Sequence, residues 1–274
     1  MKSSSVIFFL TLLMVMLVQS ATLSDDHPQR ANTSFYAEGE ELLYDVSWFG
    51  ISIGTIRLQT LSVPEFLKAV KHKAVAYIDS RSGLPFIDIH LVAYTEMDSS
   101  FNSLNSYSYE EQDDGWQKIQ YRYQLLEKKI VVEEATQETL DSPPQHSVVR
   151  DTIHLSRTPI QDGVSLVFLG RHLSQVQDSI SYPTISNEKL GETLFYPLRP
   201  HSKVNIKAWK KPIHVVELSG KLKLEGIFGL TGDYKGWFSN DAAAIPITAE
   251  MKIILGSVKI ELKQWNRKGW NPPE

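Results

Sequence analysis

Apolar and polar residues alternate along most of this chain, and this alternation limits the possible folds more than any other feature. The pattern is clearest over residues 42–48, 247–253 and 258–262, where every second side chain is apolar. Successive side chains of a β-strand point to opposite faces of the sheet, so each segment has one buried face and one solvated face. This patterning predicts antiparallel β-sheet.

Turn residues separate these segments at regular intervals. Asp113-Asp114-Gly115 divides two such segments and is a strong hairpin signal. The segments number about a dozen to fourteen, which is typical of sandwiches and barrels. We therefore predict an all-β fold with one short helix, built as a single domain: a large antiparallel β-barrel or a strongly curved sheet. The helix should span residues 163–176, where Asp162 can cap its N-terminus and apolar residues recur at helical spacing.

The first twenty residues resemble an export signal. Lys2 precedes residues 6–18, in which one threonine is the only polar residue, and small residues stand near Ser20. Thirteen helical residues cover about 20 Å, less than the roughly 30 Å of a bilayer core. We expect cleavage between Ser20 and Ala21, and a periplasmic or otherwise exported protein. An uncleaved membrane anchor and a buried helix are the alternatives.

The predicted organisation of the chain follows from these features. It consists of a signal peptide (1–20), a mature N-terminal extension (21–35), a β-barrel-like domain (36–266) and a C-terminal tail (267–274). No later window is apolar over enough residues to cross a bilayer, so we expect no transmembrane segment after signal removal.

The chain has no cysteine, which excludes disulfides, thiolate metal sites, cysteine nucleophiles and a lipidated N-terminal cysteine. Lys and Arg number 28 against 32 Asp and Glu, a net charge of −4 that argues against nucleic-acid binding. No histidines are paired at metal-ligand spacing, and P-loop, GxGxxG and GxSxG motifs are absent. We therefore expect no metal and no cofactor, and we assign no catalytic residue.

Three separate stretches of the sequence carry a family resemblance. They are residues 39–48 followed by Gly50 and Gly54, Asp162 followed by an apolar helix with Arg171, and residues 232–241 followed by 245–246 and 255–258. In this order they resemble the exported bacterial family catalogued as domain of unknown function 3108, over residues 35–265. The resemblance implies a single β-rich domain in the envelope of Gram-negative-type bacteria, and it implies no activity.

Aromatic residues supply the first candidate binding site. Tyrosines occupy what reads as matching faces of the hairpin around residues 113–115, and two tryptophans lie in the segments that carry the resemblance. Tyr and Trp present apolar faces with polar tips, which suits a lipid or a sugar inside a wide barrel. The alternative is that they are core residues between two packed sheets. The candidate ligand-binding residues are Trp48, Tyr107, Tyr109, Tyr121, Tyr123 and Trp237.

A basic segment supplies the second candidate site. Lys203, Lys207, Trp209 and Lys211 follow one another at alternate positions, which would place them on one face of a strand. A row of amines with one indole could contact an anionic glycan or lipid head group. The alternative is a solvated outer face, or an edge strand protected by lysines.

These features favour a non-catalytic β-barrel module that binds an apolar or amphipathic envelope ligand, either a lipid or a glycan. One alternative is an enzyme that processes an envelope polymer, for which Asp88 and His90 on one strand face are the candidate pair. Another is an assembly partner of a different envelope protein.

Overall fold

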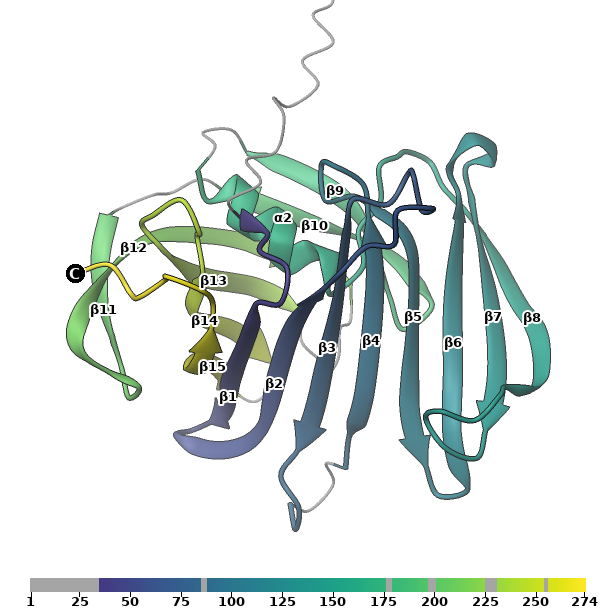
Figure 1. The fold of residues 1–274 in the computed structure, drawn as a ribbon, viewed down its shortest axis with the longest axis horizontal. Coiled ribbons are helices and arrows are strands. Elements are labelled where there is room, and N and C mark those ends of the chain that lie inside the picture. Colours follow the sequence, from purple (N-terminus) through teal and green to yellow (C-terminus); the bar gives the residue numbers. More distant parts are fainter. Residues whose placement is uncertain (1–34, 85–87, 176–178, 197–200, 225–230, 254–255) are drawn as a thin grey trace, which may run out of the picture. The chain divides into compact units, whose positions relative to one another are not determined.

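The computed structural model describes residues 35–84, 88–175, 179–196, 201–224, 231–253 and 256–274. The predicted signal peptide and its cleavage point lie outside these residues. Within the described part of the chain, 15 strands form one antiparallel sheet around one α-helix (Figure 1). The strands are β1 (Glu41–Trp48), β2 (Ile51–Leu61), β3 (His72–Ser80), β4 (His90–Met97), β5 (Ser103–Gln112), β6 (Gly115–Gln124), β7 (Lys129–Gln137), β8 (Gln145–His154), β9 (Ile180–Ser186), β10 (Lys189–Tyr196), β11 (His201–Ile206), β12 (Trp209–Leu222), β13 (Gly232–Ser239), β14 (Pro246–Ile253) and β15 (Gly256–Asn266).

The strand order is β8-β7-β6-β5-β4-β3-β2-β1-β15-β14-β13-β12-β10-β9, and β11 pairs with β12 beside this path. Strands that follow one another in the chain mostly pair directly, because antiparallel neighbours need only short connections. The ladder between β1 and β15 joins the first strand to the last, from Glu41 opposite Asn266 to Trp48 opposite Val258. The prediction of an all-β, strongly curved antiparallel sheet with one helix is confirmed, and the strands slightly exceed the expected number.

The two end strands of this sheet are brought together by side chains. Ile185 of β9 packs in one apolar cluster with Ile130 and Val132 of β7. Arg150 of β8 forms an ion pair of 3.1 Å with Glu188, in the turn between β9 and β10. The described residues form no backbone ladder between β8 and β9. Gln161 forms a single backbone bridge to β9: its N–H donates to the carbonyl of Pro183 and its carbonyl accepts from the N–H of Ile185, both at 2.9 Å. The sheet therefore curls back on itself, and side-chain packing and this bridge hold the β9 end in place.

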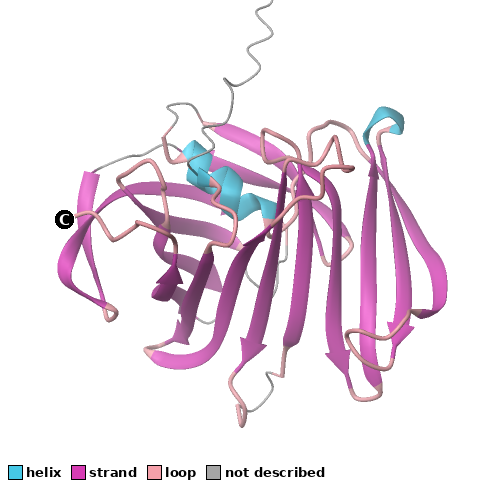
Figure 2. Cartoon of the chain, in the orientation of Figure 1, coloured by secondary structure: helices cyan, strands magenta, loops and turns pink. Residues whose placement is uncertain are grey.

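The helix α2 (Ser165–Leu173) lies between the two halves of the sheet (Figure 2). Phe168 packs in the cluster that contains Leu42 of β1, whereas Leu169 packs in the cluster that contains Leu218 of β12. The predicted helix over residues 163–176 is confirmed over Ser165–Leu173, and residue 176 lies outside the described residues. In the described part of the chain, no helix combines the length and the apolar character that a bilayer span requires.

A buried group of charges joins α2 to the sheet. The fully buried Arg171 guanidinium donates from Nη1 and Nη2 to the Glu40 carboxylate, at 2.5 and 3.1 Å, and to the carbonyl of Ala243 at 2.9 Å. Arg267, just after β15, also donates to the Glu40 carboxylate. Charges removed from water are tolerated only when they are paired and hydrogen-bonded in this way. We refer to Glu40, Arg171, Ala243 and Arg267 as the Arg171 network.

Arg171→Met should lower the free energy of unfolding by about 3–5 kcal/mol, because it removes one member of a buried ion pair and leaves its partners under-compensated. Urea unfolding followed by tryptophan fluorescence measures the change. Arg122→Met is the control: Arg122 is exposed and pairs with Glu133 at 2.7 Å. Losing this surface pair should cost less than about 1 kcal/mol. Equal losses in the two variants would contradict a central role for the Arg171 network.

Candidate functional site

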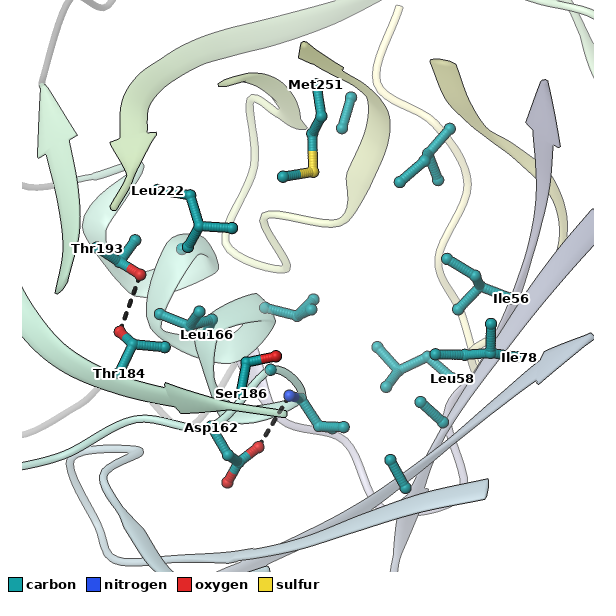
Figure 3. Close-up of a pocket in the computed structure, with 18 of the residues that line it drawn as sticks. Ile56, Leu58, Ile78, Asp162, Leu166, Thr184, Ser186, Thr193, Leu222 and Met251 are labelled. Atoms are coloured by element: carbon teal, nitrogen blue, oxygen red, sulfur yellow. Dashed lines mark hydrogen bonds between the residues drawn. The ribbon is translucent and has the colours of Figure 1, made fainter. Parts of the chain in front are cut away.

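A cavity of about 420 Å³ lies inside the curl of the sheet, beside α2 (Figure 3). Most of its lining side chains are aliphatic or aromatic. Ile56, Leu58 and Ile78 point into the space from one side, and Leu222 and Met251 from other sides (Figure 3). Its volume falls in the range of about 300–1,000 Å³ that is usual for small-molecule sites.

Two alanines create part of this space. Ala76 of β3 lies directly opposite Ala93 of β4, and Leu58 of β2 lies opposite Ala76. All three residues line the cavity. Because directly opposed residues share a sheet face, the two methyl groups leave a hollow where larger side chains would meet. The small residues at these positions therefore determine how much room the interior retains.

The helix and the second half of the sheet form the remaining walls. Leu166 and Val167 of α2 line the cavity together with Leu222 of β12 and Met251 of β14. Methionine is flexible and polarisable, and it adapts to apolar contacts of varied shape. The cavity is therefore enclosed mainly by hydrocarbon groups on several sides.

Asp162 is the carboxylate that borders the cavity. Its Oδ2 accepts hydrogen bonds from the hydroxyls of Thr95 at 2.6 Å and Ser103 at 2.7 Å. Its Oδ1 accepts from the backbone N–H groups of Val164 at 2.8 Å and Ser165 at 3.0 Å. Burial raises the pKa of Asp162, whereas these hydrogen bonds act in the opposite direction. Asp162, the predicted helix cap, thus also links α2 to β4 and β5. Each of its two carboxylate oxygens already accepts two hydrogen bonds from other groups of the protein.

Several other polar groups around the cavity are hydrogen-bonded within the protein, whereas the buried hydroxyl of Tyr44, a lining residue, has no hydrogen-bond partner among the described residues. The hydroxyls of Thr184 and Thr193 are hydrogen-bonded to each other at 2.8 Å (Figure 3). The Tyr121 hydroxyl accepts from the backbone N–H of Glu188 at 3.2 Å, and the Tyr234 hydroxyl donates to a backbone carbonyl at 3.0 Å. The surface that these groups leave to an occupant is predominantly apolar.

The hairpin of β5 and β6 divides the four candidate tyrosines into two pairs. Tyr107 lies opposite Gln120, whereas Tyr121 lies opposite Ser106. A shift of one residue reverses the face of a side chain, so the tyrosines of β5 and those of β6 lie on opposite faces of the sheet. The prediction that all four share a face is wrong. The two-residue turn at 113–114 sets this register.

One pair of tyrosines faces the interior. Tyr121 lines the cavity, and Tyr123 packs beside it against the apolar cluster of β7. Tyr107 also borders the cavity, but its ring packs against that of Tyr109 with centroids 5.8 Å apart. The Lys118 ammonium lies 5.1 and 5.6 Å from the centroids of these two rings, a cation–π arrangement on the other face of the sheet.

The two candidate tryptophans lie away from the cavity lining. Trp48 packs beside Val46 and Ile53 near the β1–β2 turn, where its ring centroid is 5.0 Å from that of Phe49. Trp237 of β13 packs against the apolar cluster that contains Leu42 and Phe168. The structure therefore places the six candidate aromatic residues in four different surroundings rather than around one site.

The basic segment forms a hairpin rather than one strand. Lys203 lies on β11, Lys207 in the turn and Lys211 near the start of β12, with Ile206 opposite Trp209. The prediction that they share one strand face is wrong, because the chain reverses direction at residues 207–208. The alternation of the sequence continues across this turn, so two strands read as one. The three lysines are exposed, whereas Trp209 packs against the apolar core.

Asp88 and His90 lie on the surface, outside the cavity lining. The imidazole Nδ1 of His90 is 3.0 Å from Asp79, and its Nε2 is 3.6 Å from Asp88, which is 91% exposed. The hydrogen bond with Asp79 raises the pKa of His90. In the described part of the chain, no cluster of three or more His, Asp and Glu side chains could hold a metal ion.

Sequence reasoning missed the residues that create the cavity. Ala76, Ala93 and Met251 occupy alternate strand positions, so their faces could be read from the sequence pattern. Which faces enclose space, and which pack tightly, depends on how far the sheet curls.

Comparison with known proteins supports the fold. A crystal structure described as a β-barrel-like protein of domain of unknown function DUF1849 from Brucella abortus is similar, with a TM-score of 0.56 and 10% identity over 85% of this chain and 99% of that chain. The lipoprotein LppX from Mycobacterium tuberculosis aligns over 88% of this chain and 93% of that chain, at 9% identity and a TM-score of 0.23. No family model matches the sequence. No curated protein matches it either.

Asp162→Ala should lower the free energy of unfolding by about 3 kcal/mol, because it removes a helix cap and leaves two buried hydroxyls without their acceptor. Asp162→Asn should cost about 1 kcal/mol, since an amide oxygen can keep the backbone bonds and rotated hydroxyls can accept from its NH₂ group. Urea unfolding curves compare the two variants. If the Asn variant lost as much stability as the Ala variant, the side chain would not act through these bonds.

Proposed function

We propose that this protein is an exported, non-catalytic β-barrel-like module that binds the acyl chain of an envelope lipid in the cavity beside α2. The observation that carries the proposal is the hydrocarbon lining of an internal space of about 420 Å³. Burying an apolar chain against such a lining is favourable by about 25 cal/mol per Å² of surface removed from water.

The lining favours a lipid over a glycan. A glycan needs hydrogen-bond partners for its many hydroxyls, and leaving them unmade inside the protein is costly. Asp162 and the Thr184 and Thr193 hydroxyls already bind other protein groups. The same engagement argues against Asp162 as an acid or base for a substrate, and thus against the enzyme alternative.

The proposed location and family rest on the sequence. The segment that resembles a signal peptide supports export to the periplasm or cell envelope. We also propose membership of the family catalogued as domain of unknown function 3108, on the residues that carry that resemblance. An amphipathic lipid whose head group stays outside the cavity fits this location.

Native mass spectrometry of protein purified from its own host tests the proposal directly. We expect a bound species that organic solvent extracts and that lipid analysis identifies by its acyl chains. Protein that is ligand-free in its own host, and that also fails to bind a fluorescent fatty acid, would contradict lipid binding.

Ala93→Phe should reduce binding of a fluorescent fatty acid by about tenfold, because the added ring occupies space that the ligand needs. Fluorescence titration measures the dissociation constant. Ala69→Phe, at an exposed position in the β2–β3 loop, makes the same chemical change away from the cavity and should leave binding unchanged. Equal affinities in both variants would place the ligand elsewhere.

A further inference from the structure

The turn between β1 and β2 exposes large apolar side chains. Residues 48–51 read Trp-Phe-Gly-Ile and contain no charged group. Phe49 is 75% exposed and Ile51 is 63% exposed, although both are of types usually buried. The turn lies at the lower left of Figure 1, where β1 and β2 meet. We refer to residues 48–51 as the β1–β2 tip.

The backbone of the tip makes its phenylalanine unusual. Phe49 has a φ of 47° and Gly50 has a φ of 79°, so both lie in the left-handed region. Glycine adopts this conformation freely and asparagine readily, but it is strained for a bulky residue. Phe49 gains some packing in return, since its ring lies beside Trp48 and close to Gly256. Most of the ring nevertheless faces solvent, so folding alone does not account for a phenylalanine here.

Apolar side chains connect the tip to the cavity. Trp48 packs on the small cluster of Val46, Ile53 and Val258. Ile56 and Ile260 pack on the same cluster and also line the cavity. A continuous apolar region therefore extends from the exposed rings to the cavity wall. A protein that takes a lipid from a membrane would benefit from such a connection, because it places apolar contacts next to the binding site.

We propose that the β1–β2 tip inserts into the surface of a lipid bilayer and directs this end of the sheet towards the membrane. The inference rests on the proposed lipid-binding function, since the occupant is inferred from the cavity to which the tip connects. Trp and Phe are well suited to the boundary between head groups and acyl chains. Because the tip has no charge, its attraction to the bilayer depends on burial of apolar surface.

Co-sedimentation with phosphatidylcholine vesicles tests the proposal. The full chain should bind, and Phe49→Asn should weaken binding by about tenfold through loss of one buried aromatic side chain. Asparagine tolerates the left-handed conformation better, so this variant should unfold at the same or a higher urea concentration. Loss of binding without loss of stability separates membrane contact from a structural role. Ile51→Ser, at the second exposed position, should also weaken binding.

Phe66→Ser is the matched control. Phe66 is 79% exposed and lies in the β2–β3 loop, at the opposite end of β2 from the tip. It should bind vesicles like the unchanged protein. Raising the salt concentration from about 0.1 M to about 1 M should not weaken binding, because only charge-based attraction is screened. Absence of vesicle binding, equal losses at Phe49 and Phe66, or tip-dependent self-association without vesicle binding would overturn the proposal.

The cavity variant distinguishes this proposal from the proposed function. Ala93→Phe should weaken fatty-acid binding but leave vesicle binding unchanged, whereas Phe49→Asn should weaken vesicle binding but leave fatty-acid binding unchanged. If the purified protein carries no lipid but binds vesicles through the tip, the lipid-carrying function fails and membrane contact stands. If it carries lipid but does not bind vesicles, membrane contact fails and the lipid-binding function stands.

Discussion

The buried guanidinium of Arg171 links parts of the chain that are far apart in sequence. Glu40 precedes the first strand, Arg267 follows the last strand, and Ala243 precedes β14. Burying these charges is costly unless every partner is in place, so the network is satisfied only when helix, first strand and last strand meet correctly. It therefore helps to specify how the two halves of the sheet are joined.

The same network explains why α2 lies inside the fold. The helix is anchored at one end by Asp162, through Thr95 and Ser103, and near its other end by Arg171. Between these anchors, Leu166 and Val167 border the cavity. The helix thus occupies part of the interior and forms one wall of the cavity. Polar interactions hold the helix in position, and apolar side chains form the surface that a ligand would contact.

The described strands β8 and β9 form no continuous backbone ladder, and this bears on the proposed function. In place of the ladder that would close a fully hydrogen-bonded barrel, Ile185 packs against Ile130 and Val132, Arg150 pairs with Glu188, and Gln161 forms one backbone bridge to β9. Side-chain contacts can separate with less disruption than a continuous ladder of backbone hydrogen bonds. The proposed lipid binding would benefit from a wall that lacks a continuous backbone ladder. The proposed insertion of the exposed β1–β2 tip, which apolar residues connect to the same interior, would place the proposed lipid site beside a membrane.

Much of this architecture could be read from the sequence. Period-two alternation determined the antiparallel sheet, and Asp162 with its apolar run determined the single helix, because both patterns depend on local backbone geometry. Register and closure could not be read in this way. The turn at 113–114 places Tyr121 on the opposite sheet face from Tyr107. The turn at Lys207 leaves the sequence alternation uninterrupted, so the β11–β12 hairpin reads in the sequence as a single strand. Local pattern decides which side chains share a strand face, whereas only the curl of the sheet, set by distant contacts, decides which faces enclose a cavity.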